Sequence, residues 1–399
     1  MSGTMLPVLP GAWPGLIRLP GHPAAHLGAG AAARLSDALA ALGADRVLVV
    51  HGQTSYLRSG ADRSVAALSE RHTVEHFDGV RPNPGIEQIR AGVDAVRRFA
   101  PHAVVGIGGG SSLDVAKTIA VLAAQRHDAE ECLRHTEVVT ERRECALVLL
   151  PTTAGSGSEM TRFATVYIEG RKHSLDVDQA RADLVLVDTD LTASLPLGDS
   201  VASGLDALSQ AVESYWSVAA TDVSRALALN ALDRLVPALA RAADTGTFTD
   251  PAIRVGTAHG ASLAGAAIDL TRTTAAHALS YDLTARLGLA HGIAVALNLP
   301  WLLERHATVG ASDCRHPRGA SAVRDAVAVI EDVTRNRAGR SVRQLVEQLL
   351  IRAGQPARIE DLALPAEHWR GPLTEALASG RATNNPCLLT EADVLQLLR

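Results

Sequence analysis

Short apolar runs alternate with amphipathic segments through the first half of the chain. The runs are flanked by segments rich in glycine, proline and aspartate, as expected for buried strands that end in turns. Segments with helical periodicity lie between them, at Ala31–Leu42, Ser64–His72 and Ile86–Phe99. Strands and helices alternating at this spacing indicate a parallel sheet in an α/β domain. The predicted strands are Arg46–Val50, Val74–Phe77, Ala103–Ile107, Cys145–Leu150, Phe163–Ile168 and Leu184–Val187.

From Pro196 onward the pattern changes to helices alone. The chain therefore predicts an α/β domain over residues 1–195 and a helical domain over residues 196–399. The last helix begins after Thr390, with Asp393 at the capping-box position. The other predicted helices of this domain are Ser203–Tyr215, Val223–Arg241, Pro251–Ala267, Thr274–Arg286, His291–His306, Ala320–Asn336 and Val342–Ala353.

Composition narrows the class of protein. The 399 residues are 47% hydrophobic and 20% charged, as in a globular protein large enough for two domains. A net charge of −5 without a basic stripe argues against a nucleic-acid partner. The chain has no run of 18 apolar residues that would span a membrane, and its first twenty residues lack the pattern of a secretory signal. Four cysteines without paired spacing fit a reducing compartment, so we expect a cytoplasmic protein.

A run of glycines follows the predicted strand Ala103–Ile107 and precedes a helix. Bare glycine backbone lets amide groups approach phosphate oxygens, and a helix N-terminus adds positive potential. We therefore expect this turn to bind a phosphate; a tight strand–helix turn is the alternative. Asp114 and Lys117, on the following helix, face the nucleotide, a neighbouring element, or each other as a surface ion pair. The residues of the turn are Gly108, Gly109, Gly110, Ser111 and Ser112.

A second small-residue loop, Pro151–Glu159, follows the predicted strand Cys145–Leu150. Hydroxyl groups and glycines at the carboxyl edge of a parallel sheet suit contacts to ribose, phosphate or nicotinamide. Thr152, Thr153 and Ser156 are the candidate nucleotide contacts. A plain Ser/Gly connection is the alternative.

His277 and His291 bracket an apolar segment of the helical half. Neutral imidazole is the commonest metal ligand, but the two positions are 14 apart (291 − 277), too far for one turn of helix. If both bind a metal, they come from two elements that meet, with a bend at Gly288. Two unrelated histidines at helix ends are the alternative, because a metal site needs at least three converging ligands.

Three blocks, taken in order, resemble the iron-containing (group III) alcohol dehydrogenase family, whose relatives include glycerol dehydrogenase and dehydroquinate synthase. They are Gly108–Lys117, Pro151–Glu159, and His277 with His291-Gly292. The resemblance covers nearly the whole chain. It implies an N-terminal nucleotide-binding α/β domain, an all-α C-terminal domain and a metal in the cleft between them.

The family's metal ligands are an Asp, a His four residues later and two further His. The matching positions are Asp206, Gln210, His277 and His291, so a glutamine replaces one expected histidine. An i,i+4 pair shares one helix face, but an amide oxygen is a weak ligand, which leaves Fe, Zn, Mn or no metal as options. One divalent metal is the expectation, and it would polarise the aldehyde oxygen. Tyr281 replaces a histidine that many members place beside the nicotinamide, and it is a candidate proton donor.

One position after the first strand bears on the cofactor. Members that prefer NAD often carry an Asp there, which accepts a hydrogen bond from the ribose 2′-hydroxyl. This chain has Gly52, followed by Gln53, and the absence of an acidic group permits the 2′-phosphate of NADP. We therefore expect NADPH as the cofactor, with NAD as the alternative.

Within the family, residues 271–281 are most similar to the phosphonoacetaldehyde reductase branch. A phosphonate calls for cationic donors; the candidates are Arg162 and Arg272, with an ordinary salt bridge as the alternative for each. Lys172 is a further candidate, for the phosphonate or the nucleotide. The expected reaction is NADPH-dependent reduction of phosphonoacetaldehyde to 2-hydroxyethylphosphonate in phosphonate antibiotic biosynthesis, by a homodimer or larger homo-oligomer.

Three other functions stay open. A general short-chain alcohol dehydrogenase would prefer uncharged aldehydes. A lyase like dehydroquinate synthase would use the same fold with bound NAD but would need more cationic residues, and Lys117 and Lys172 are the only lysines. A catalytically inactive relative that only binds nucleotide is the third, given Gln210.

Overall fold

The computed structural model describes residues 16–362 and 370–397, which divide into two compact units. The first contains the described residues up to Thr153 together with Ser158–Leu195. The second contains Ala154–Gly157 and the described residues from Pro196 onward. Among the described helices, none combines the length and apolar character needed to cross a membrane.

The predicted domain boundary after residue 195 differs from this division only at residues 154–157, which belong with the helical unit. The predicted domains also include residues 1–15, 363–369 and 398–399, which lie outside the described residues.

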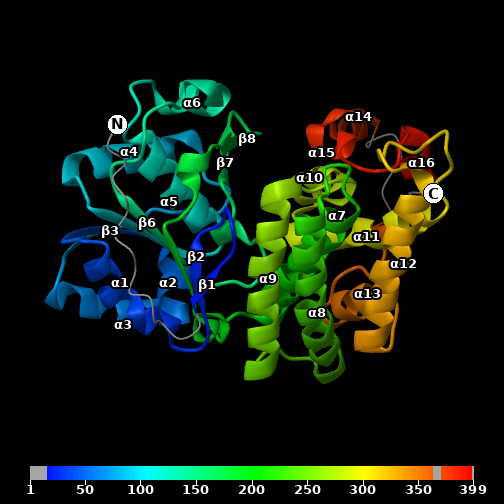
Figure 1. The fold of residues 1–399 in the computed structure, drawn as a ribbon, viewed down its shortest axis with the longest axis horizontal. Coiled ribbons are helices and arrows are strands. Elements are labelled where there is room, and N and C mark those ends of the chain that lie inside the picture. Colours follow the sequence, from blue (N-terminus) through cyan, green and yellow to red (C-terminus); the bar gives the residue numbers. More distant parts are fainter. Residues whose placement is uncertain (1–15, 363–369, 398–399) are drawn as a thin grey trace. The chain divides into compact units, whose positions relative to one another are not determined.

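The strands of the first unit are β1 (Leu16–Arg18), β2 (Ala24–Leu27), β3 (Arg46–His51), β4 (Thr73–Phe77), β5 (Ala103–Gly108), β6 (Ala146–Pro151), β7 (Phe163–Ile168), β8 (Arg171–Asp176) and β9 (Leu184–Val187). Seven of them form one sheet in the order β1-β2-β9-β6-β5-β3-β4 (Figure 1). β1 runs antiparallel to β2, and the other neighbours are parallel.

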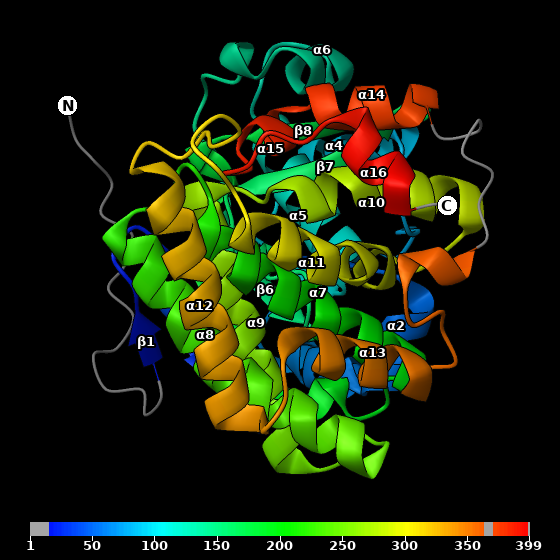
Figure 2. The ribbon, with the colours of Figure 1, turned by 90° about the vertical axis from the view of Figure 1, so that its right-hand side faces the viewer.

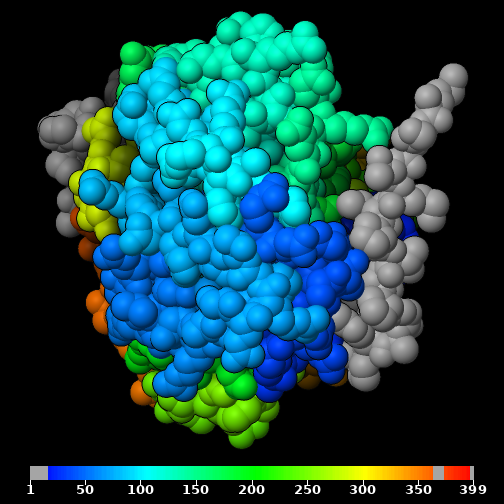
Figure 3. Space-filling view, turned by 90° about the vertical axis from the view of Figure 1, so that its left-hand side faces the viewer, coloured from blue at the N-terminus to red at the C-terminus, as the bar shows by residue number. Residues whose placement is uncertain are grey.

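Helices cover both faces of this sheet, which is why its central strands are apolar at every position. Val47 and Val49 of β3 pack on one face with Leu35, and Gly106 of β5 lies on the other face against Ala116. Figure 3 shows much of the surface of this unit in a space-filling view, coloured from blue to green-cyan along the sequence. The helices are α1 (Leu35–Ala41), α2 (Gln53–Ser59), α3 (Ala61–Ala66), α4 (Ile86–Phe99), α5 (Gly110–Leu122) and α6 (Ala129–Arg134).

The order of the strands creates a topological switch point beside β3. From β3 the chain adds β4 on one side and then returns to add β5 on the other. Ligands of open α/β sheets bind outside the carboxyl ends of the strands at such a point. Gly52 follows β3 there, and the glycine turn begins at Gly108, the last residue of β5. The fold therefore brings two predicted nucleotide-binding segments to one edge.

The largest difference from the predicted elements follows β3. The sequence predicts a helix at Ser64–His72, whereas α2 begins at Gln53 and is followed directly by α3. Gly60, with φ 79°, separates the two helices because glycine adopts left-handed backbone at little cost. Tyr56 is the only buried residue of α2, so this helix has no apolar periodicity by which the sequence could reveal it.

β8 is a strand that the hydrophobic pattern does not predict, because most of its residues are polar. It pairs antiparallel with β7 across the two-residue loop Glu169-Gly170. These residues have φ 52° and 74°, as in a type I′ hairpin turn.

The second unit is helical (Figure 2). Its helices are α7 (Leu197–Trp216), α8 (Asp222–Thr245), α9 (Pro251–Thr271), α10 (Ala275–Leu287), α11 (His291–Ala307), α12 (Gly319–Ala338), α13 (Val342–Arg352), α14 (Arg370–Ala378), α15 (Gly380–Thr383) and α16 (Glu391–Leu397). α7 is central and packs against α8, α9 and α11. Small residues allow these helices to approach closely; a Cβ on Gly260 of α9, for example, would meet Leu235 of α8.

The predicted capping box is present at the start of α16. The Thr390 N–H donates to the Asp393 carboxylate at 2.8 Å, and the Asp393 N–H donates to the Thr390 hydroxyl at 3.3 Å. Two backbone donors at the helix start are thereby satisfied.

Candidate functional site

α7 presents three acidic or amide side chains on one face. Asp206, Gln210 and Glu213 are spaced at i, i+4 and i+7, which places them in one row along the helix. All three side chains are buried. The resemblance assigns Asp206 and Gln210 to a metal, whereas Glu213 has no predicted role. Buried polar groups of this kind require partners from other elements.

Two histidines meet Asp206. His277 lies in the first turn of α10, and His291 is the first residue of α11. Ligand atoms of the three residues all lie within 4.8 Å of one another, and the His277 Nε2 is 3.2 Å from the Asp206 Oδ1. Gly288, with φ 68°, ends α10 and lets the chain turn back. A carboxylate and two imidazoles form a donor set that fits a divalent metal with an open coordination position.

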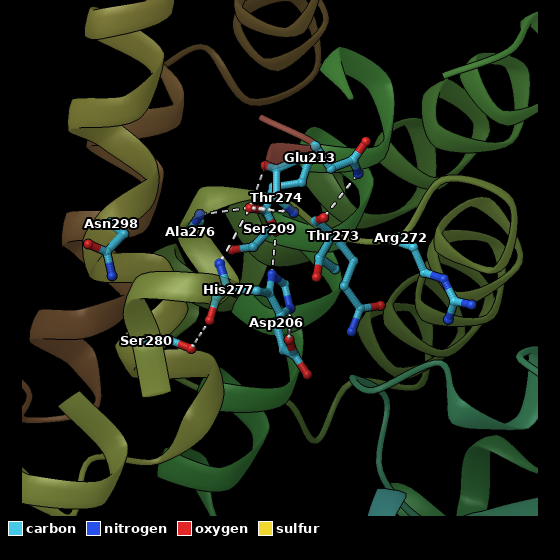
Figure 4. A network of polar contacts seen from close by, with 12 residues as sticks. Asp206, Ser209, Glu213, Arg272, Thr273, Thr274, Ala276, His277, Ser280 and Asn298 are labelled. Atoms are coloured by element: carbon cyan, nitrogen blue, oxygen red, sulfur yellow. Dashed lines mark hydrogen bonds and ion pairs between the residues drawn. The ribbon is translucent and has the colours of Figure 1, made fainter. Parts of the chain in front are cut away.

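Glu213 fixes the orientation of His277 (Figure 4). Its fully buried carboxylate accepts a hydrogen bond from the His277 Nδ1–H. It also accepts from the Thr274 hydroxyl at 2.7 Å and from the Ala276 N–H at 2.8 Å. With the proton on Nδ1, the Nε2 lone pair of His277 faces Asp206 and is available to a metal. Carboxylates that hold metal-ligating histidines in this way tune the affinity of many metal sites.

Burial and charge act in opposite directions within this cluster. Burial raises the pKa of Asp206 and of Glu213, but opposing interactions outweigh it and hold both pKa values below their usual range. His277 acts on both carboxylates, and His291 acts on Asp206. Burial lowers the pKa of His277, but Glu213 and Asp206 outweigh it and raise that pKa above its usual value. Both carboxylates are therefore anionic, which is the form that binds a cation.

Glu213→Gln is expected to weaken metal binding by about 10–100-fold and to lower the free energy of unfolding by about 1–3 kcal/mol. The amide preserves the shape but replaces one acceptor oxygen by a donor, which cannot accept from His277 or from the Ala276 N–H. Zn²⁺ titration calorimetry and chemical denaturation measure the two effects. Glu304→Gln, at an exposed glutamate of the same unit, is the matched control. Unchanged metal affinity would show that Glu213 serves folding alone.

The turn that precedes α10 has strained backbone. Arg272 has φ 65° and ψ 175°, a region that is essentially restricted to glycine and costs about 1–3 kcal/mol. Asn384 holds the turn by donating from Nδ2 to the carbonyl oxygens of Thr271 at 2.8 Å and Thr273 at 3.1 Å. In Figure 4 the Arg272 side chain points away from His277. Within the second unit, the Arg272 side chain is thus not directed at the predicted metal ligand His277, and its role in substrate binding stays a prediction.

Gln210 occupies the position where the family has a histidine. Its Nε2–H donates to the backbone carbonyl of Ser156 at 3.1 Å. Ser156, a predicted nucleotide contact, is thus tied through its backbone to α7. The Gln210 Oε1 is buried and has no hydrogen-bond partner among the described residues. An unsatisfied amide oxygen in the same buried row as Asp206 fits a weak fourth metal ligand.

Gln210→His is expected to strengthen Zn²⁺ binding by at least about tenfold, the scale on which even outer-shell groups alter metal affinity. An imidazole nitrogen is a better ligand for this metal than an amide oxygen. Competition with a chromogenic chelator measures the affinity, and Gln348→His, on α13, controls for an added histidine outside the cluster. Unchanged affinity would mean that residue 210 does not face the metal.

Two glycines of the loop 151–159 are required for packing. A Cβ on Gly155 would lie 2.7 Å from the Cα of Ser203 in α7, and a Cβ on Gly157 would lie 2.5 Å from the Cα of Gly265 in α9. Gly157 also has φ 59°, which favours glycine. These glycines, which the sequence associates with ribose or phosphate, instead allow residues 154–157 to lie directly on the helices of the second unit.

Tyr281 lies one helical turn after His277 on α10. Its ring is parallel to that of His291, with centroids 6.4 Å apart. Arg381 of α15 places its guanidinium carbon 5.3 Å from the centroid of the Tyr281 ring, within the range of a cation–π contact. Arg381 is therefore a cation close to Tyr281 and His291, and the sequence analysis does not identify it.

The glycine turn of the first unit closes tightly over the start of α5. Gly108 has φ 145°, and a Cβ there would lie 2.5 Å from the Ser112 hydroxyl. Gly109 is the N-cap of α5, whose first backbone N–H groups have no partner within the helix. A Cβ on Gly109 would lie 3.4 Å from the Thr153 methyl group, so Thr153 adjoins the turn. This arrangement fits a bound phosphate group.

Thr152 provides a second indication of a ligand at this edge. Its N–H donates to the Gly108 carbonyl at 2.9 Å, next to the glycine turn. Its hydroxyl is buried and has no hydrogen-bond partner among the described residues. A buried hydroxyl without a partner beside an anion-binding turn suits a polar ligand.

An acidic side chain lies beside Gln53. The Gln53 Nε2–H donates to the Asp78 carboxylate at 3.1 Å, and Gly52 forms a bridge with Gly79. Asp78 follows β4, the strand next to β3. It therefore supplies an acidic group close to Gly52, where the sequence itself has none. Such a carboxylate suits a ribose 2′-hydroxyl and repels a 2′-phosphate.

Asp114 and Lys117 face a neighbouring element, one of the three predicted options. Asp114 accepts from the Ser158 hydroxyl at 2.6 Å and from the Thr165 N–H at 2.9 Å. The fully buried Lys117 donates to the Ser158 and Thr161 hydroxyls at 2.8 and 3.0 Å. Both carboxylate oxygens of Asp114 are thus used inside the unit. The pair anchors the start of β7, where a compact ammonium fits among several oxygens, and the role of Asp114 in nucleotide binding stays a prediction.

Arg162 makes ion pairs within the first unit. Its guanidinium lies 3.0 Å from Asp176 and 3.2 Å from Asp178. These are the ion pairs of the salt-bridge alternative, and binding of a phosphonate by Arg162 stays a prediction. Lys172 lies in β8 opposite Tyr167 of β7, and its role in binding stays a prediction.

Two family models together match most of the chain. Residues 23–189 match the iron-containing alcohol dehydrogenase family, and residues 200–399 match the C-terminal domain of the Fe-containing alcohol dehydrogenase family. The chain is 34% identical over 283 residues to long-chain-alcohol dehydrogenase 1 of Geobacillus thermodenitrificans, covering 70% of this chain and 71% of that protein. It is 33% identical over 378 residues to phosphonoacetaldehyde reductase of Streptomyces viridochromogenes, covering 92% and 85%.

A solved structure agrees with the fold. Sulfoacetaldehyde reductase from Bifidobacterium kashiwanohense, in complex with NAD+, superposes with a TM-score of 0.80 at 24% identity, covering 94% of this chain and 95% of that one. The predicted fold and the predicted family are therefore confirmed. The chain belongs to the iron-containing alcohol dehydrogenase family of oxidoreductases.

Proposed function

We propose that this enzyme uses NADPH to reduce a small aldehyde, and that the aldehyde is phosphonoacetaldehyde, which yields 2-hydroxyethylphosphonate. The observation that carries the reductase activity is the cluster of Asp206, His277 and His291, with His277 held by Glu213. The 33% identity to a phosphonoacetaldehyde reductase over 92% of the chain supports the substrate. A general alcohol dehydrogenase is the second candidate, because a long-chain alcohol dehydrogenase is equally similar over a shorter stretch.

A divalent metal (Fe, Zn or Mn) held by these three ligands would act as a Lewis acid on the aldehyde oxygen. Asp206 supplies the negative charge of the donor set, and Glu213 keeps the Nε2 of His277 directed at it. In this proposal Tyr281, whose ring lies parallel to that of His291, would give the product oxygen its proton. The protein's remaining task is to hold the aldehyde carbon in range of the hydride donor and to exclude water.

For the nucleotide, the first unit supplies the glycine turn and the N-terminus of α5, which bind the pyrophosphate in this proposal. Gly52 favours NADPH because it carries no acid, whereas the nearby Asp78 carboxylate favours NADH. We retain NADPH as the proposed cofactor and expect the Asp78 carboxylate to reduce the preference of the enzyme for NADPH over NADH.

Asp78→Asn is expected to raise kcat/KM for NADPH relative to NADH by about fivefold. Removing one like charge near an exposed phosphate is worth about 1 kcal/mol in water. Initial rates with each nucleotide measure the ratio. Asp37→Asn, at an exposed aspartate of the same unit, is the matched control. An unchanged ratio would place the 2′ position of the ribose away from Asp78.

The test of the substrate is NADPH oxidation by metal-reconstituted protein, with phosphonoacetaldehyde and acetaldehyde at equal concentration. A strong preference for phosphonoacetaldehyde supports the proposal. The KM for phosphonoacetaldehyde of Arg272→Ala and of Arg381→Ala then shows which of the two cations binds the phosphonate. Equal rates favour the general alcohol dehydrogenase. No rate with either aldehyde or either nucleotide, in protein shown to contain metal, overturns the reductase proposal.

A further inference from the structure

Two cysteines of the second unit lie directly opposite each other. Cys314 and Cys387 form an isolated antiparallel bridge between two segments that are otherwise irregular. The hydrogen bonds of the bridge come from the flanking residues: the Arg315 N–H donates to the Pro386 carbonyl at 2.8 Å, and the Leu388 N–H donates to the carbonyl before Cys314 at 2.7 Å. The cysteines are therefore a non-hydrogen-bonded pair, the arrangement in which facing side chains are closest.

This geometry suits a disulfide. In a non-hydrogen-bonded antiparallel pair the Cα atoms are about 4.5 Å apart, which falls inside the range of about 4.4–6.8 Å found for disulfides. Both side chains also project from the same face of the pair, because residues directly opposite in a ladder do so. Cys387 packs in an apolar cluster with Val309 and Val323, and Cys314 packs against the same cluster. In the structure both residues are free thiols.

The bridge adjoins the residues that support the turn before the metal ligand. Asn385, two residues before Cys387, donates to the Cys387 carbonyl at 2.8 Å and to the His306 ring at 3.1 Å. The preceding residue, Asn384, holds the strained turn at Arg272. A link at Cys387 would therefore fasten the segment that supports this turn.

We propose that Cys314 and Cys387 are a site of reversible oxidation, at which a small-molecule disulfide converts them to a cross-strand disulfide without rearrangement of the fold. The Cys314 thiolate attacks one sulfur of the oxidant and releases one thiol. The Cys387 thiol then loses its proton, attacks the Cys314 sulfur of the mixed disulfide, and releases the second thiol. Two protein thiols are oxidised, and the small disulfide is reduced to two thiols, so electrons and protons balance.

The exposure of the two thiols sets the order of these steps and their rate. Cys314 is partly exposed, so it meets the oxidant first. Cys387 is buried, and burial raises its pKa to about 12. Little Cys387 thiolate is therefore present at neutral pH, so we expect the closing step to be slow. The other two cysteines, Cys132 and Cys145, are buried in the first unit and form no such bridge among the described residues.

The full-length protein is equilibrated for a day with oxidised glutathione or with reduced glutathione, then denatured and alkylated. Alkylatable thiols are expected to fall from four to two in the oxidised sample only. A non-reducing digest should contain one linked peptide pair, joining Cys314 to Cys387. The midpoint of thermal unfolding should rise by about 5 °C or more, because the link closes a long loop of the unfolded chain. Dithiothreitol should reverse all three changes.

Cys314→Ser is the control variant: its remaining thiols should stay free, and its midpoint should not respond to the oxidant. Four free thiols in the oxidised wild type would overturn the proposal. So would a glutathione adduct on Cys314 without a link, or a link that involves Cys132 or Cys145. A linked protein with a lower midpoint would show that the reduced geometry does not accommodate the disulfide, which also overturns it. None of these outcomes depends on the substrate or the nucleotide.

Discussion

His277→Ala is expected to lower kcat/KM for aldehyde reduction by roughly a thousandfold or more, while NADPH still binds. A Lewis-acid metal stabilises the transition state by several kcal/mol, and each 1.36 kcal/mol corresponds to about a tenfold change in rate. His277 is one of three residues in the metal cluster of the described chain. Nucleotide binding should persist because the glycine turn belongs to the other unit.

Steady-state kinetics and a fluorescence titration with NADPH separate the two effects. The variant also leaves the buried Glu213 carboxylate without the hydrogen bond from His277, so thermal denaturation is needed to show that the protein is folded at the assay temperature. His259→Ala is the matched control, because His259 belongs to α9 of the same unit but not to the cluster. Turnover retained in His277→Ala would rule out its role as a metal ligand.

Gly292→Ala is expected to lower the free energy of unfolding by about 3 kcal/mol or more, and to abolish tight metal binding. A Cβ at this position would overlap the carbonyl oxygen of Ala202 in α7 and would lie 3.0 Å from the Cβ of Asp206. The obstacle is helix backbone, which cannot rotate aside as a side chain can. α11 must therefore move away from α7, and it carries His291 away from Asp206 as it moves.

Chemical denaturation and Zn²⁺ titration measure these two effects. Gly198→Ala is the matched control, because Gly198 lies in α7 with open space where its Cβ would be. Its stability should change by no more than about 1 kcal/mol, in the stabilising direction, because alanine favours a helix over glycine. Wild-type stability and metal affinity in Gly292→Ala would contradict the close packing of the two helices.

The sequence by itself determined the central strands of the sheet and the glycine turn that follows β5. Ala103–Ile107 is apolar at every position, because a central parallel strand is buried on both faces, so the run predicts β5 to within one residue. The three glycines at 108–110 likewise predict the tight turn after β5, because the conformation of such a turn depends on residues that are adjacent in the sequence. Resemblance to a family added the predicted metal ligands: Asp206 and His277 are 71 positions apart, and no local pattern relates them.

Only the tertiary structure decided what the charged residues do. Glu213 lies at i+7 from Asp206 in an apolar helix, and this spacing indicates a buried acid. The sequence does not reveal its partner, which the fold shows to be His277. In the sequence Lys117 has the spacing of a surface ion pair with Asp114, but in the fold it is fully buried among oxygen atoms. Arg162 lies beside two aspartates of its own unit. The backbone conformation of a strand or a glycine turn depends on consecutive residues, so it can be recognised in the sequence. A charge acquires its role from partners that folding brings within hydrogen-bonding distance, and those partners are distant in the chain.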